Sequence, residues 1–180
     1  IVGETRGKEA YTLFQAMATG HGGFSSIHAD SIEATLTRLV SAPMDVPKAL
    51  IANSLDLVTL QLKIRVGNKS ARRIIQVAEI DGIDEKTGQL KTNTVFKWNP
   101  KTDTHDYSGK SVVFEKIMER DGDTQEKIDY ELLKRRVALE WMVKNDIREH
   151  KKVSEVIMEY YQDPERFYER VRVQVWYEFY

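Results

Sequence analysis

The middle of this chain changes its hydrophobic period, and that change constrains the fold more than any other feature. Residues 60–66 alternate strictly between aliphatic and polar side chains, which is the two-residue period of a strand with one buried face. Gly67–Ser70 predicts a turn into a second β-rich run over residues 71–80, and a third run ends at Trp98. Pro100 prevents one uninterrupted strand from continuing beyond it. We therefore expect a β meander in the middle of the chain.

Segments with helical signals precede the meander. Residues 9–18 contain good helix formers and are followed by Gly20, a natural helix terminator. Residues 24–29 form a short β-prone run. Asp30 and Glu33 bracket a start resembling a capping box, with Asp30 accepting backbone N–H groups and Glu33 reaching back. A helix over residues 32–40 and a short one over residues 47–55 should follow.

The chain becomes helical from about residue 110. Residues 123–126 predict the start of a long amphipathic helix, and Asp163 with Pro164 predicts the start of the last one. Residues 171–180 alternate with aromatic side chains and suit a strand, a frayed end or an artificial extension. The long helix is expected to direct four apolar side chains inward: Ile128, Leu132, Leu139 and Met142.

Composition excludes several classes of protein. The 180 residues carry a net charge of −1, which gives no bulk attraction to nucleic acid, so we expect no direct nucleic-acid partner. We find no stretch approaching the roughly 18 apolar residues that a transmembrane helix needs. The absence of cysteine excludes disulfides, thiolate zinc sites and cysteine nucleophiles, and it fits a reducing cytoplasm.

The first 30 residues contain the chemistry-bearing side chains. A strand-end carboxylate at Glu4 is followed by a glycine-rich turn that holds His21 and His28. A carboxylate at a strand end can orient water at a nucleotide, and histidine can donate to phosphate oxygens. On residue types alone, an ordinary strand-to-loop junction with surface histidines explains the same pattern.

The exact strings resemble the secretion ATPase superfamily, whose motors power type II and type IV secretion, type IV pili and archaella. Residues 1–10 look like the end of its Walker B motif, and residues 19–31 look like its His box. Residues 96–109, 136–142 and 160–165 resemble the archaeal branch. The similarity covers residues 1 to about 170.

This resemblance implies an α/β fold in which residues 1–100 are the C-terminal part of a RecA-like P-loop ATPase core, β meander included. Residues 101–180 would form a helical C-terminal region. The implied cofactors are ATP and Mg²⁺. Glu4, His28 and His21 would be catalytic, and no residue would bind metal directly, although Glu4 could reach Mg²⁺ through water. The implied nucleotide-binding residues are Arg6, Thr19, Gly20 and Arg38.

The resemblance also implies an assembly. The parent protein would be a cytoplasmic homo-hexamer on the inner face of the cell membrane, acting on a polytopic membrane platform protein. Arg6 would brace the loop more than it touches phosphate. Arg38 and Gln61 fall where the family has recurrent Arg and Gln, and surface roles for them fit equally well. Secretion, pilus assembly and archaellum rotation share this motor chemistry, so the sequence does not distinguish them.

The chain departs from the family pattern in lacking a phosphate-binding P-loop. Its only Gly-Lys-Ser, at Gly109–Ser111, has Thr104 where the first glycine belongs, and it follows Glu4 instead of preceding it. We interpret it as a false match. We therefore expect a piece that starts within the Walker B motif and is inactive alone, with Ile1 and Val2 in a central parallel strand. That strand's exposed edge would need covering by self-association or by rearrangement.

Two other functions remain open. The chain could be a non-catalytic docking or oligomerisation module whose front motifs are vestigial. It could also belong to a conjugative DNA-transfer motor, which would show DNA-stimulated ATPase activity.

Overall fold

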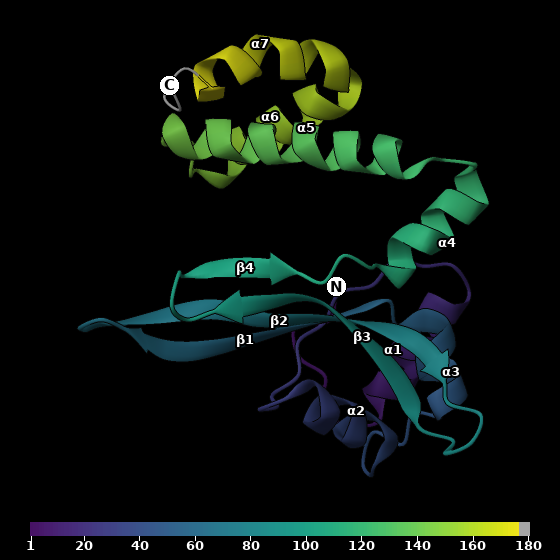
Figure 1. Ribbon diagram of the computed structural model, residues 1–180. Coiled ribbons are helices and arrows are strands. Elements are labelled where there is room, and N and C mark those ends of the chain that lie inside the picture. Colours follow the sequence, from purple (N-terminus) through teal and green to yellow (C-terminus); the bar gives the residue numbers. More distant parts are fainter. Residues whose placement is uncertain (177–180) are drawn as a thin grey trace. The chain divides into compact units, whose positions relative to one another are not determined.

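The computed structural model describes residues 1–176 and divides the chain into two compact units, Ile1–Glu115 and Lys116–Tyr180. The first unit contains three helices and a four-stranded sheet, and the second is helical (Figure 1). The chain is therefore α/β with a helical C-terminal region, as predicted. The predicted domain boundary after residue 100 stays a prediction.

The sheet is an antiparallel meander in the order β1-β2-β3-β4. Its strands are β1 (Leu57–Val66), β2 (Lys69–Ile83), β3 (Leu90–Asn99) and β4 (Thr104–Tyr107). Gly67 adopts φ 58° in the β1–β2 turn, which a residue without Cβ tolerates. The predicted meander is confirmed. The strand β4, which pairs with the end of β3, was not predicted from the sequence.

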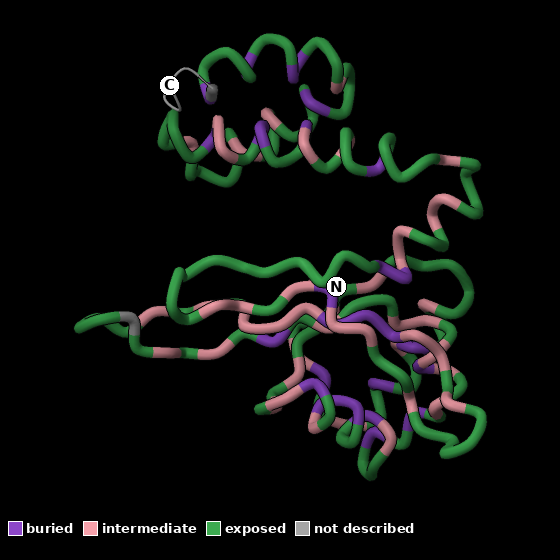
Figure 2. Tube along the Cα trace, viewed as in Figure 1, coloured by how far each residue is buried: buried purple, intermediate pink, exposed green. Residues whose placement is uncertain are grey.

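Three helices lie on one face of this sheet: α1 (Glu9–Ala18), α2 (Ile32–Val40) and α3 (Lys48–Ser54) (Figure 1). Buried residues of these helices and of β1 and β2 belong to one core cluster. Figure 2 shows the buried stretches of the chain on both layers. Its most deeply buried members include Ile32, Ile51 and Ile80, each at most 1% exposed. Burial of aliphatic area on both layers fixes the helices against the sheet.

Local signals set the helix ends. The predicted bounds of α1 are confirmed, and Gly20 after it adopts φ 95°. The predicted cap of α2 was wrong, because Ser31 and not Asp30 is its N-cap. The Ser31 Oγ accepts the Ala34 N–H at 2.9 Å. Ser and Asp are equivalent acceptors at this position, so the pattern left the register open by one residue.

The predicted opening strand is not formed. Val2 makes one isolated parallel bridge with Ser25, and Ile1 is fully exposed. The run over residues 24–29 likewise contributes only this bridge. A strand needs paired neighbours along its length, and residues 1–176 offer this segment only a short loop to pair with.

The second unit packs α5 (Gln125–Lys144), α6 (His150–Gln162) and α7 (Pro164–Trp176) around a shared core. The helix α4 (Val112–Asp121) crosses residue 115, where the two units divide. Within α5, Ile128 and Met142 are buried as predicted. The prediction for Leu132 and Leu139 was wrong, because they are 39% and 58% exposed.

The sequence left open whether residues 171–180 form a strand, a frayed end or an artificial extension. Val171–Trp176 belongs to α7, so this part is helix, and residues 177–180 lie outside the described residues. Asp163 accepts the Arg166 N–H at 3.0 Å, which confirms the predicted start of α7 at Pro164.

In residues 1–176 no helix combines the length and apolarity that crossing a membrane requires.

Candidate functional site

The two sequence strings of the first 30 residues lie side by side. Val2 N–H donates to the Phe24 carbonyl at 2.9 Å, and Thr5 N–H donates to the Ser26 carbonyl at 2.8 Å. In return, Ser26 Oγ donates to the Gly3 carbonyl at 2.7 Å. These bonds clamp the loop that carries Glu4 onto the loop that carries His28.

Glu4 is the centre of the resulting cluster. Arg6 Nη2 donates to its Oε2, and His28 Nε2 lies 3.3 Å from its Oε1. The hydrogen bond from Arg6 holds the pKa of the Glu4 carboxyl below its ordinary value, although partial desolvation acts in the opposite direction. The same contact raises the pKa of Arg6. Glu4 is therefore a fixed, ionised acceptor near neutral pH.

Arg38 reaches this cluster from α2. Its Nη1 donates to the backbone carbonyl of His28, and its charge further lowers the pKa of Glu4. The structure thus brings Glu4, Arg6, His28 and Arg38 together, and their catalytic and nucleotide-binding roles stay predictions. The side chains of Arg6 and His28 are 72% and 83% exposed, which leaves these donors accessible to an anion from solvent.

Glu9 closes the loop after Glu4, a role that was not predicted from the sequence. Its Oε1 accepts the backbone N–H groups of Arg6 and Gly7 at 2.7 and 2.8 Å. The Arg6 amide contributes most to the lowered pKa of Glu9. The available signal was a carboxylate in the first turn of a helix, where it can accept orphan N–H groups.

The remaining predicted residues form a separate local turn. Thr19 Oγ1 donates to the Ala16 carbonyl at 2.8 Å, and it lies 3.2 Å from His21 Nδ1. His21 Nδ1 is also 3.1 Å from that carbonyl. Within residues 1–176 no hydrogen bond or ion pair joins Thr19, Gly20 or His21 to the Glu4 cluster.

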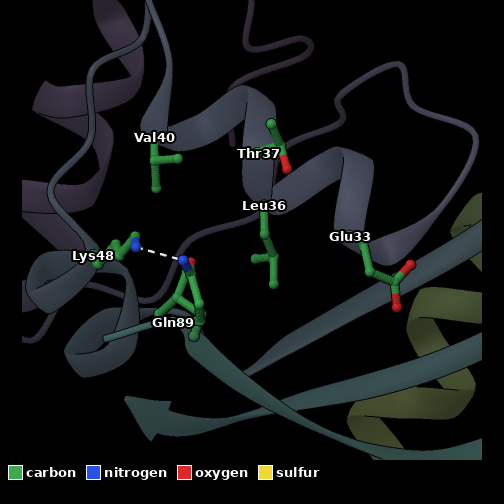
Figure 3. Close-up of a pocket in the computed structure, with 7 residues that line it drawn as sticks. Glu33, Leu36, Thr37, Val40, Lys48 and Gln89 are labelled. Atoms are coloured by element: carbon green, nitrogen blue, oxygen red, sulfur yellow. Dashed lines mark hydrogen bonds between the residues drawn. The ribbon is translucent and has the colours of Figure 1, made fainter. Parts of the chain in front are cut away.

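A shallow pocket of about 220 Å³ lies elsewhere, between α2, α3 and the start of β3. It is lined by Glu33, Leu36, Thr37, Val40, Lys48, Gln89 and Leu90 (Figure 3). Lys48 Nζ donates to the Gln89 side-chain oxygen at 2.8 Å and to the Gly88 carbonyl at 2.9 Å. Its ammonium is therefore already bound to the protein, and none of the predicted site residues lines this pocket.

The Glu4 cluster suits the handling of a charged phosphate and a water molecule. An ionised, rigidly held carboxylate can orient water, while neighbouring cations can offset negative charge. Direct metal binding is a different matter. The described residues contain no group of three or more His, Asp or Glu side chains arranged to hold an ion.

Comparison with known proteins now identifies the class. Residues 1–159 match the family described as type II/IV secretion system protein. The uncharacterized protein MJ1287 of Methanocaldococcus jannaschii is 39% identical over 132 residues, which is 73% of this chain and 48% of that protein. The uncharacterized protein MJ0900 of the same organism is 33% identical over 166 residues, covering 90% of this chain and 30% of that protein.

A bacterial relative carries a functional name. The type IV secretion system protein PtlH of Bordetella pertussis is 33% identical over 94 residues, covering 46% of this chain and 27% of that protein. The chain thus belongs to the type II/IV secretion system protein family, and the predicted resemblance is confirmed. It spans about half or less of the length of these relatives.

Proposed function

We propose that this chain is part of an ATPase that powers protein secretion or the assembly of a type IV pilus or archaellum. The observation that carries the proposal is the clamped pair of loops that brings His28 to 3.3 Å from Glu4. Family membership supports the same conclusion. Residues 1–180 contain no P-loop sequence, so we expect no ATP turnover from these residues alone.

Glu4 would position the attacking water. Because Arg6 lowers its pKa, Glu4 is a weak proton acceptor, and holding water is the better role for it than removing a proton. His28 and Arg38 would face the terminal phosphate and offset the charge that develops there. Arg6 would fix the Glu4 carboxylate, in agreement with the bracing role predicted for it. The turn that contains Thr19, Gly20 and His21 would contact the nucleotide only if nucleotide binding moved it towards the Glu4 cluster.

The residues of the Glu4 cluster suit a phosphate and a water-mediated contact with Mg²⁺ better than direct coordination of the ion. Both Glu4 oxygens already have a partner, Arg6 at Oε2 and His28 at Oε1. That arrangement suits contact with the ion through water more than direct coordination. When bound, Mg²⁺ would neutralise charge on the phosphates, and the protein side chains described above would orient water and donate hydrogen bonds.

The whole protein would work as a cytoplasmic homo-hexamer at the inner face of the cell membrane, acting on a polytopic membrane platform protein. Exposed apolar side chains support a protein partner for the helical unit. Leu139 and Val143 on α5 are 58% and 66% exposed, and Met158 and Tyr161 on α6 are 63% and 65% exposed. The same observation favours the second candidate function, a docking module without catalysis.

Substitution of Glu4 in the full-length protein tests the proposal. We expect Glu4→Gln to lower the ATPase rate by about 100-fold or more with little change in nucleotide affinity, because the amide no longer offers an ionised acceptor. The control is Glu85→Gln, an exposed carboxylate in the β2–β3 connection. It should leave both quantities unchanged.

Histidine variants sharpen the same test. His28→Gln should slow hydrolysis, whereas His150→Gln, at an equally exposed histidine of α6, should not. Unchanged secretion or assembly by the Glu4→Gln protein would instead support the docking module. ATP turnover that rises with added DNA and falls steeply with salt would support the conjugative alternative.

A further inference from the structure

Glu79 in β2 is the most buried charged residue that the structure describes. Its side chain is 1% exposed, and it lies opposite Asn93 in the register of β2 and β3. A carboxylate without water is costly unless strong hydrogen bonds or opposite charge replace its hydration. Within residues 1–176 Glu79 has no ion pair with a Lys, Arg or His side chain, so its stabilisation comes from hydrogen bonds.

Most of those hydrogen bonds come from Ser111 and the first residues of α4, and one comes from Asn93 of β3. Ser111 Oγ and Val113 N–H donate to Oε1 at 2.5 and 3.3 Å. Val112 N–H donates to Oε2 at 2.6 Å, and Asn93 Nδ2 donates to the same oxygen at 3.1 Å. The unpaired N–H groups of a helix N-terminus and its dipole favour an anion. Glu79 supplies this anion from the sheet.

The turn before α4 is also fixed to the sheet. Gly109 adopts φ 86°, a conformation that glycine allows. The Lys110 carbonyl accepts hydrogen bonds from Asn93 Nδ2 at 3.1 Å and from Ser108 Oγ at 3.0 Å. Ser108 N–H in turn donates to the Val95 carbonyl of β3 at 2.9 Å.

This arrangement explains the Gly-Lys-Ser string that resembled a P-loop. A P-loop directs helix N-terminal N–H groups at a phosphate. Here the helix after Gly109–Ser111 directs them at the protein's own carboxylate. The string is a false P-loop match in sequence, and its conformation holds an internal anion.

We propose that Glu79, Asn93 and Gly109–Ser111 form a latch that holds the first turn of α4 on the sheet. Removal of the carboxylate opens the latch. The first turn of α4 then frays while the sheet stays folded. Because α4 crosses residue 115, this turn begins the helix that continues from the first unit into the second. The latch does not depend on ATPase activity.

Hydrogen exchange on the full chain tests the latch. In Glu79→Ala we expect the amides of Val112 and Val113 to exchange at least tenfold faster, while the amides of β1 and β2 keep their protection. Added formate should restore protection at Val112 and Val113, because it can occupy the vacated place at the helix N-terminus. Glu85→Ala, at an exposed carboxylate in the same unit, is the control and should change neither.

Two results would overturn the proposal. One is unchanged exchange at Val112 and Val113 in Glu79→Ala. The other is an equal loss of protection across β1 and β2, which would make Glu79 a requirement of the core instead of a latch. Should Glu79→Ala fail to fold, Ser111→Ala provides the second test, since it removes one donor from the α4 side. It should raise exchange at Val113 and Phe114, whose amides bond Glu79 and the Ser111 hydroxyl.

Discussion

The core of residues 1–115 is mainly aliphatic, whereas the core of residues 116–176 combines aliphatic side chains with packed aromatic rings and lies beside an ion network. In the first, α1–α3 and the sheet bury isoleucine, leucine and valine. In the second, Phe167 packs edge-on against Trp141 and Tyr160 at centroid distances of 5.8 Å. Helices without a sheet have less shared surface to bury, and large rings supply more apolar area per residue.

The ion network of the second unit centres on Lys134 of α5. Its side chain is 8% exposed, and its Nζ lies 3.0 Å from Glu131 and 2.7 Å from Glu165 of α7. Tyr160 of α6 donates to Glu131 at 2.8 Å, and Tyr130 donates to Glu165 at 2.8 Å. The network therefore joins all three helices. The two units should accordingly respond differently to lost volume, lost charge and pH.

Loss of the central ring should have the largest effect. Phe167→Ala removes a side chain that is 2% exposed, and we expect the second unit to lose about 3–5 kcal/mol of stability. Hydrogen exchange should show the loss in α5–α7 and leave β1 and β2 protected. Ile51→Ala is the matched change in the first core. It should lower the protection of β1 and β2 and leave α5–α7 protected. Loss of protection in both units from either variant would contradict the independence of the two cores.

Loss of the buried ammonium should have a smaller effect. Lys134→Met leaves Glu131 and Glu165 without their shared cation, but the Glu165 side chain is 59% exposed and water can solvate it. We expect a destabilisation of about 1–2 kcal/mol, measured by denaturant unfolding. Lys127→Met, at a 68% exposed lysine of the same helix, should stay within about 0.5 kcal/mol of the original protein. Equal effects from both would show that the network contributes no more than a surface pair.

The smallest effect should appear only at the extremes of pH. Burial and the bond to Glu131 raise the pKa of Tyr160 to about 12. For Lys134, burial lowers the pKa, and the bonds to Glu165 and Glu131 outweigh burial and raise it above 10.5. Raised pKa values mean that the folded state holds these protons more tightly, so stability falls as pH rises through about 10 to 12.

Tyr160→Phe tests this dependence. It should remove the part of the alkaline loss of stability that is due to Tyr160, on the order of 1 kcal/mol, whereas Tyr161→Phe should not. A stability–pH profile of Tyr160→Phe identical to that of the original protein would contradict this assignment.

Acid acts on the two carboxylates of the same network, Glu131 and Glu165. The pKa of Glu165 is lowered by its bonds with Lys134 and Tyr130. Burial raises the pKa of Glu131, but the bonds from Lys134 and Tyr160 outweigh it and lower the pKa. Their stabilisation is present above pH 4.5 and is lost as pH falls below it.

Some of this molecule could be predicted because the signal is local. The bounds of α1, the Gly20 terminator and the Asp163–Pro164 helix start depend on a few neighbouring residues, and each agrees with the structure. Two linked motifs drew attention to Glu4 and His28, and the structure places their side chains 3.3 Å apart. Glu9, which binds the Arg6 and Gly7 amides of the loop after Glu4, was missed although its place in the first turn of a helix was a local signal.

Other features depend on partners far along the chain. Leu132 and Leu139 looked like part of the buried face of α5, yet both are exposed. Beside Ile128 and Met142, α5 buries Lys134, Val137 and Ala138. The packing of α7 against α5 decides that rotation. Glu79 looks like an ordinary strand residue until Ser111, 32 positions later, meets its carboxylate.

By itself, the sequence determined the strand and helix periods, most element ends and the family to which the chain belongs, because these depend on spacing and short-range contacts. The tertiary structure decided which carboxylates are buried, which apolar side chains stay exposed and which anion meets the Gly109–Ser111 turn. Those outcomes follow from long-range packing and desolvation. No local pattern encodes them, because the interacting groups come from distant segments and only share a dielectric environment once the chain has folded.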